Sequence, residues 1–256
     1  MIPATLVGMA LAMGSLIVTM LLEDSSPLAV VLLPPLVLVF GGTFGAALAG
    51  STMTDLRTLG SWFRMAFGPE GATTAGSVIP QLVELATLAR KDGMLPLENR
   101  ARVVEDPFLR HGLQLAIDAV PIDQVRHILE REIDATRADD LVAARFFAKM
   151  GGYAPTIGII GTVVGLVQVL KSLQDPSVLG PLVASAFVAT LWGVLSANFF
   201  WLPISAKIRR NADLRRDQMQ LMLEGVCEIL AGTNPRALRQ KLRAMLPPSE
   251  AQLSAA

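Results

Sequence analysis

Residues 150–170 read MGGYAPTIGIIGTVVGLVQVL and contain no charged side chain. About 20 mostly apolar residues allow an α-helix to cross the hydrocarbon of a bilayer, where only closed backbone hydrogen bonding is tolerated. Three further stretches, residues 1–22, 25–54 and 176–206, also lack charge and are long enough. The sequence therefore predicts an all-α, polytopic membrane protein with four transmembrane helices and a helical cytoplasmic region.

Composition and charge support this prediction. Hydrophobic residues make up 52% of the chain and charged residues only 17%. This composition is more apolar than a soluble domain of this length requires. Apart from Lys171, every Lys and Arg lies in residues 57–149 or from Lys207 onward. Because cytoplasmic loops are enriched in Lys and Arg, we expect both basic segments and both termini to be cytoplasmic.

The same pattern divides the chain into four parts. Residues 1–50 form a predicted transmembrane hairpin of spans one and two, and residues 150–206 form a second hairpin of spans three and four. Residues 51–149 lie between them as a cytoplasmic region of several helices, because apolar residues recur at helical spacing between Gly and Pro breaks. Residues 207–256 form a cytoplasmic helical tail.

Small residues recur on the predicted spans. Gly41 with Gly45, and Gly161 with Gly165, repeat the Gly-xxx-Gly spacing, which lets membrane helices approach each other closely. Packing within the chain is the plainer explanation, and contact between subunits is the alternative.

Hydroxyl groups lie near the middle of two predicted spans, at Thr162 and Thr190. A membrane hydroxyl often only bonds back to a carbonyl one turn earlier, but two at similar depth can also line a hydrated path. None of the four charge-free stretches holds an Asp, Glu, His, Lys or Arg residue, although such residues usually mark ion routes. If the protein conducts a cation, we expect the carboxylate to come from a partner.

Several other classes of function are disfavoured. The sequence has neither a phosphate-binding loop nor a nucleophile motif, and its basic residues are interspersed with acidic ones, which argues against an enzyme and against nucleic-acid binding. His111 and His127 lie far from any Cys or acidic pair, so no metal or cofactor is expected. Cys227 is the single cysteine and is expected to pack in a core.

Three tracts carry a family resemblance. They are residues 154–166 (APTIGIIGTVVGL), residues 106–115 (DPFLRHGLQL), and Asn234-Pro235-Arg236 with Gln240-Lys241-Leu242. Together they resemble the MotA/PomA family of flagellar stator subunits over nearly the whole chain and with the same four-span layout. The first tract alone is also similar to the TolQ/ExbB energy transducers of the same superfamily.

The resemblance implies an ion-driven stator subunit of the bacterial inner membrane. With a MotB/PomB-type single-span partner, such a subunit forms a channel for Na⁺ or H⁺ and converts ion flow into torque. The family assembles as a homopentamer around two partner copies, and the partner supplies the ion-binding aspartate. The rotor protein FliG is the implied second partner, and the transported cation takes the place of a cofactor.

The resemblance also assigns roles to particular charged residues. Residues 88–98 match the rotor-facing tract of the family, with Arg90, Lys91 and Glu98 at rotor-binding positions. Some relatives carry a second acid directly after that glutamate, whereas this chain has Asn99. We therefore expect the acidic side of the contact to be weaker here.

Four residues of the spans match functional positions. Pro155, at the start of span three, and Pro203, at the end of span four, match prolines that couple ion flow to motion, since a proline removes a donor and bends a helix. Thr190 matches the threonine beside the partner's aspartate. Thr162 matches a position where sodium-driven members tend to carry threonine, which favours sodium.

Two other functions stay open at this point. A TolQ/ExbB-like transducer usually has three spans and its large cytoplasmic segment after the first, whereas this chain has its long segment between spans two and three. A passive membrane scaffold would not need the charged tract from Arg90 to Glu98. Both differences favour the stator.

Overall fold

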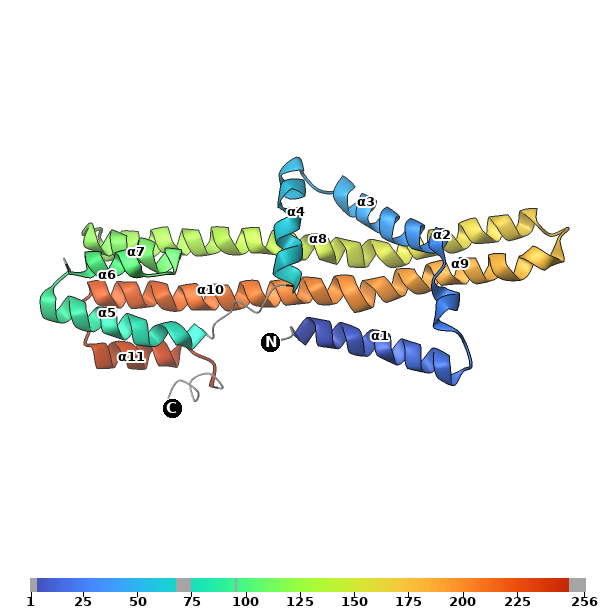
Figure 1. Cartoon of the computed structure of the whole chain (residues 1–256). Coiled ribbons are helices and arrows are strands. Elements are labelled where there is room, and N and C mark those ends of the chain that lie inside the picture. The colour runs from blue at the N-terminus through green and yellow to red at the C-terminus, as the bar shows by residue number, and fades with distance from the viewer. Residues whose placement is uncertain (1–3, 68–74, 95, 249–256) are drawn as a thin grey trace. The chain divides into compact units, whose positions relative to one another are not determined.

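The computed structural model describes residues 4–67, 75–94 and 96–248, and all regular elements in these ranges are helices (Figure 1). In chain order the α-helices are α1 (Ala4–Leu22), α2 (Leu33–Leu36), α3 (Gly42–Ala49), α4 (Met53–Phe67), α5 (Ile79–Asp92), α6 (Leu97–Val103), α7 (Pro107–Ile117), α8 (Ile122–Lys171), α9 (Pro176–Ser196), α10 (Leu202–Leu230) and α11 (Pro235–Ala244). Two π-helices, η2 (Val37–Gly41) and η4 (Ala197–Trp201), join α2 to α3 and α9 to α10. The predicted all-α class is confirmed for the described residues.

The chain forms two compact units. We call them the span unit (Met1–Pro69 and Leu141–Arg209) and the head unit (Glu70–Asp140 and Arg210–Ala256). Helices α8 and α10 each contribute to both units. Because this division follows contacts within the chain and not the membrane surface, the predicted domain limits after residues 50, 149 and 206 stay predictions.

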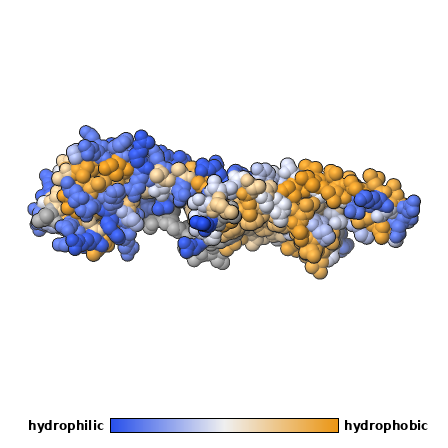
Figure 2. Space-filling view, turned by 90° about the horizontal axis from the view of Figure 1, so that it is seen from above, coloured by the Kyte–Doolittle hydropathy of each residue, from blue (hydrophilic) through white to orange (hydrophobic). Residues whose placement is uncertain are grey.

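Three helices of the described chain are long and apolar enough to cross a membrane: Ala4–Leu22, Ile122–Lys171 and Pro176–Leu230. The surface over the span unit is largely hydrophobic in Figure 2. Leu11, with 76% of its surface exposed, and Ile159, with 57%, are examples. Such exposure suits side chains that face lipid.

The predicted second span is a shorter apolar helix, Leu33–Ala49. Pro34 and Pro35 stand at its first turn, the only helical position where a missing amide costs no hydrogen bond. The preceding apolar residues therefore form a separate turn, the 3₁₀ segment η1 (Pro27–Val30), capped by the Ser26 side chain. The number of spans thus remains a prediction.

Helices α8 and α9 are antiparallel and approach each other at their backbones. A Cβ atom on Gly193 would lie 2.7 Å from the carbonyl oxygen of Ala154 and 3.0 Å from the Cα atom of Gly158. A Cβ atom on Gly158 would in turn lie 2.9 Å from the carbonyl oxygen of Ala189. Only glycine at both positions allows this separation, because backbone atoms cannot move aside as a side chain can.

The two Gly-xxx-Gly pairs differ in their surroundings. Cβ atoms on Gly161 and Gly165 would each lie 2.6 Å from the Cβ atom of an alanine on α9, so this pair packs within the chain. Cβ atoms on Gly41 and Gly45 would meet nothing within 4 Å. Packing within the chain thus explains the pair on α8 and leaves the other pair uncovered.

An aromatic cluster packs α4 against the ends of the spans. The ring of Phe147 stacks on Trp201 with centroids 6.5 Å apart and meets Phe63 edge-on at 5.4 Å. Trp62 lies 5.3 Å from Phe146. Trp201, at the end of η4, is therefore part of a packed core.

The head unit has its own apolar core. Helices α5, α6, α7 and α11 pack with one end each of α8 and α10 through fully buried side chains, including Leu82, Leu97, Leu113, Leu129 and Leu238. Cys227 lies in this core, and burial raises the pKa of its thiol. The predicted packing role for this cysteine agrees with its position.

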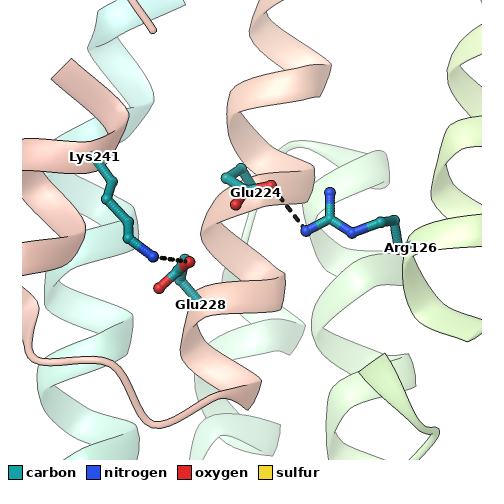
Figure 3. A network of polar contacts seen from close by, with 4 residues as sticks. All are labelled: Arg126, Glu224, Glu228 and Lys241. Carbon is teal, nitrogen blue, oxygen red and sulfur yellow. Dashed lines mark hydrogen bonds and ion pairs between the residues drawn. The ribbon is translucent and has the colours of Figure 1, made fainter. Parts of the chain in front are cut away.

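Two ion pairs connect α10 to its neighbours in the head unit (Figure 3). Lys241 of α11 donates to Glu228 at 2.6 Å, and Arg126 of α8 donates to Glu224 at 3.0 Å. Chiefly because of the Lys241 hydrogen bond, the pKa of Glu228 is lowered. The core and these pairs fix one end of α8 beside one end of α10.

The glycine contact between α8 and α9 predicts that one added methyl group lowers the stability of the protein at Gly193 but not at Gly180. Gly193→Ala should lower the stability of the purified protein by about 1–3 kcal/mol, as overpacking does. Gly180→Ala, on the same helix with nothing within 4 Å, is the matched control. Thermal unfolding in detergent measures both, and equal midpoints would contradict the close backbone contact.

Candidate functional site

Thr162 of α8 and Thr190 of α9 form the polar centre of the span unit. Their hydroxyl groups are hydrogen-bonded to each other. The Thr162 hydroxyl also lies 3.2 Å from the carbonyl oxygen of Gly158 and 3.3 Å from that of Ala186, and the Thr190 hydroxyl lies 3.3 Å from the Gly158 oxygen. The structure therefore brings together the two threonines that the sequence placed at similar depth.

The glycine contact produces this arrangement. Because Gly158 has no side chain, α9 lies close enough for the Thr190 hydroxyl to reach a carbonyl of α8. Both threonines are half-buried. The carbonyl groups of Gly158 and Ala186 could not be predicted as part of the site, because backbone groups leave no mark on the sequence.

The site contains four oxygen atoms and no charge. Each hydroxyl has one proton to donate and two lone pairs that accept, so the pair satisfies itself and keeps spare accepting capacity. Hydroxyl and carbonyl oxygens are the ligands that hard cations prefer. No group of three or more His, Cys, Asp or Glu residues that could hold a metal exists in the described chain. A cation here needs its counter-charge from elsewhere.

The two predicted coupling prolines lie in continuous helical segments of the span unit. Pro155 is inside α8, and Pro203 is the second residue of α10, just after η4. The amide of Leu202 donates to the carbonyl of Ala197, five residues earlier, which makes a wide π-helical turn. This turn lies next to Pro203, which has no amide donor. The Leu202 side chain packs onto Gly151, one turn before Pro155. Helices α8 and α10 therefore each have an irregular hydrogen-bonded turn near the point where they pack together.

The predicted rotor-binding residues lie on two neighbouring helices of the head unit. Arg90 and Lys91 are exposed in the last turn of α5, and Gly93, with φ of +85°, ends that helix. Glu98 lies in the first turn of α6. Leu95, within the predicted tract, lies outside the described residues.

Ion pairs distinguish these charges. Glu98 accepts from Arg102 at 2.7 Å, and Glu84 of α5 accepts from Arg100 at 2.9 Å. Arg90 and Lys91 form no ion pair with the described part of the chain. The sequence prediction omitted Arg102, although its spacing of four residues from Glu98 on a helix indicates such a pair.

Comparison with protein families matches residues 100–221 to the MotA/TolQ/ExbB proton channel family. Motility protein A of Bacillus subtilis is 32% identical over 243 residues, covering 95% of this chain and 90% of the relative. Motility protein A of Helicobacter pylori is 32% identical over 252 residues, covering 98% and 97%. Chemotaxis protein PomA of Vibrio alginolyticus is 34% identical over 166 residues, covering 65% of each chain.

Two solved structures have the same fold. The flagellar MotAB stator complex from Bacillus subtilis contains a chain that matches with a TM-score of 0.91 and 31% identity, covering 99% of this chain and 100% of that chain. The C. jejuni MotAB structure matches with a TM-score of 0.91 and 27% identity, covering 96% of each chain. The similarity therefore extends over both the span unit and the head unit.

The threonine pair predicts a measurable coupling energy. Thr162→Val and Thr190→Val should cost less together than the sum of their single effects, by about 0.6 kcal/mol and up to about 1.7 kcal/mol, the range for hydrogen bonds between membrane helices. Unfolding of the two single variants and the double variant measures this coupling. Thr156→Val is the control partner, since its hydroxyl bonds only to Tyr153 of the same helix. Equal coupling in both cycles would contradict the pairing.

Proposed function

The chain belongs to the MotA/TolQ/ExbB proton channel family and is a multi-pass flagellar stator subunit of the MotA/PomA type, not an enzyme, and from this we propose that it works as the torque-generating half of a cation channel. A MotB/PomB-type single-span protein forms the other half. Its aspartate binds the cation beside Thr162 and Thr190.

The observation that carries this proposal is an oxygen-rich centre in spans without charge. Thr162 and Thr190 meet at the contact of α8 and α9, and residues 150–170 and 176–206 contain no acid. A cation in the hydrocarbon is costly without a counter-charge. A partner's carboxylate completes the site, which is why the subunit needs the complex.

Sodium is the cation that we favour. A sodium ion exchanges its hydration shell for several oxygen ligands, whereas a proton can pass along a chain of water molecules. Thr162 contributes a hydroxyl at a position where the family resemblance favours sodium, and it lies beside two carbonyl oxygens. Proton conduction is the alternative, and external sodium distinguishes the two.

The ion assignment predicts different outcomes for the two threonines. Thr190→Ala should lower motor speed with either ion, whereas Thr162→Ala should be severe only if sodium is the ion. The measurement is rotation speed of tethered cells against external sodium at fixed pH, with Thr156→Ala as the control. If wild-type speed does not depend on external sodium, the assignment of sodium as the transported cation is wrong. Unimpaired rotation in Thr190→Ala would remove that residue from the ion path.

Assembly and orientation complete the proposal. Four spans, with the head unit and both termini in the cytoplasm of a bacterial inner membrane, agree with the Lys and Arg distribution. A homopentamer around two partner copies places five threonine pairs around a central helix pair. The uncovered faces of Gly41 and Gly45 offer surfaces where membrane helices can approach.

Pro155 and Pro203 are proposed as the coupling residues. Each lacks an amide donor, and η4 adds a wide turn beside Pro203. A helix bends most easily where its hydrogen-bond ladder is interrupted. Motion at the cation site can thus be passed to the cytoplasmic part of the chain through α8 and α10.

Contact with the rotor protein FliG is assigned to Arg90, Lys91 and Glu98. The two cations are free to pair with acidic groups of the rotor. Glu98 must first leave Arg102, and this costs only a few tenths of a kcal/mol because exposed pairs at this spacing are weak. Within the described part of the tract, the unpaired charges are then Arg90 and Lys91 against Asp92, a net positive charge, which fits the lack of a second acid at Asn99.

Charge reversal predicts loss of motility without loss of assembly. The double variant Arg90→Glu and Glu98→Lys should weaken rotor binding about ten-fold, because like charges then oppose each other. Arg131→Glu, an exposed residue of α8, is the control. Swimming speed and membrane content of the subunit are measured together, and a complementary reversal on FliG should restore part of the speed. Normal swimming of the double variant would refute the assignment.

A further inference from the structure

A groove of about 410 Å³ lies among α2, α8 and α9 in the span unit. Its floor consists of buried small residues and its rim of exposed side chains: Gly161, Ala186 and Ala189 below, and Pro34, Val164 and Gln168 above. Neither threonine of the proposed cation site lines it. The groove therefore differs from the threonine pair but adjoins the same site, because Ala186, whose carbonyl oxygen bonds Thr162, also lines the groove.

Close helix packing forms the groove and keeps it shallow. A Cβ atom on Gly161 would lie 2.6 Å from the Cβ atom of Ala189 and 3.0 Å from Leu38 Cδ2. The floor is thus closed by direct contact of α8 and α9. The wall formed by α2 is also fixed, because the indole of Trp192 donates at 2.6 Å to the carbonyl of Val30, three residues before α2.

The groove lies at hydrocarbon depth. On α8 it extends from Gly161 to Gln168, about 10 Å of helix rise, and the first charge beyond it is Lys171. Apolar cavities do not hold water stably, and an empty groove loses dispersion contacts along its lining. Its occupant is therefore apolar over most of its length.

Size and polarity identify the kind of occupant. An apolar cavity of about 150 Å³ holds one benzene molecule, so this groove has room for a segment of an alkyl chain. Two lining side chains are polar: Gln168 at the end of the groove nearest the turn between α8 and α9, and Ser185 further along α9, next to the Ala186 that packs on Gly165. Neither side chain forms a hydrogen bond within the part of the chain that the structure describes, so both are available to a ligand.

We propose that this groove binds the acyl chain of a membrane phospholipid. The order of chemical groups along α8 agrees with the order in such a lipid. The apolar groove takes the acyl chain, the Gln168 amide donates to the ester carbonyl, and the exposed ammonium of Lys171, one turn further, pairs with the phosphate. The Ser185 hydroxyl is a second donor along the wall.

The test is retention of lipid by the full stator complex. The complex is purified from nanodiscs of phosphatidylglycerol and phosphatidylethanolamine in equal amounts, and native mass spectrometry counts the phospholipids that survive transfer to mild detergent. Val164→Phe fills the groove and should reduce retained lipid to background. Val163→Phe is the matched control, since Val163 is 56% exposed, close to the 51% of Val164, but does not line the groove.

Variants of the two residues expected to contact the lipid headgroup region give a second test that does not depend on filling the groove. Lys171→Gln should lower the preference for phosphatidylglycerol over phosphatidylethanolamine about five-fold, the effect of one basic residue near anionic lipid. Gln168→Leu should reduce total retention without changing that preference. Both residues are exposed, so these variants remain informative if Val164→Phe fails to assemble.

Three results would overturn the proposal. Equal lipid retention by Val164→Phe and Val163→Phe, with unchanged headgroup preference in Lys171→Gln, would show that no lipid sits in the groove. Loss of subunits from the complex by Val164→Phe, with lipid unchanged, would assign the groove to a second copy of this chain. Loss of the single-span partner alone would assign it to that partner's helix.

Discussion

The backbone contact between Gly158 and Gly193 is the constraint on which the span unit depends. It brings α8 and α9 so close that the Thr162 and Thr190 hydroxyls bond to each other and reach carbonyls of the opposite helix. The same approach presses Gly161 onto Ala189 and so forms the floor of the groove. One packing geometry therefore produces both an oxygen-rich centre and an apolar groove a few residues apart, because glycine exposes backbone oxygens while it shortens the distance between helices.

Much of this arrangement could be predicted from the sequence. Charge-free stretches indicated apolar helices, and the mid-span positions of Thr162 and Thr190 placed them at similar depth on adjacent spans. The division of the second stretch at Pro34 and Pro35 was not predicted, because its hydropathy is uniform and only the backbone chemistry of proline separates its parts. The Gly-xxx-Gly pattern was equally ambiguous. The face at Gly161 is packed against α9, whereas the face at Gly41 has no neighbour within 4 Å in the described chain. The spacing shows that another helix can approach such a face, but it does not identify that helix.

The charged tract shows a different limit of sequence reasoning. The family resemblance gave Arg90, Lys91 and Glu98 comparable roles, yet Glu98 is paired with Arg102 whereas the two cations are not paired within the described chain. Ion pairing depends on the geometry of side chains one helical turn apart. A match to a position in the family does not give that geometry. The proposed rotor surface therefore has a net positive free charge, and the Glu98 carboxylate can exchange its partner at low cost.

The absence of Asp, Glu, His, Lys and Arg from residues 150–170 and 176–206 has a consequence for the membrane potential of the cell. Helices without a fixed charge insulate: a hydrated cation that meets them alone faces the full cost of entering hydrocarbon. Under the function proposed above, a cell that makes this chain faster than its partner should keep its membrane potential, since conduction needs the partner's carboxylate. Dividing the conducting groups between two polypeptides, as we propose, makes assembly of the complex the step that opens the ion path.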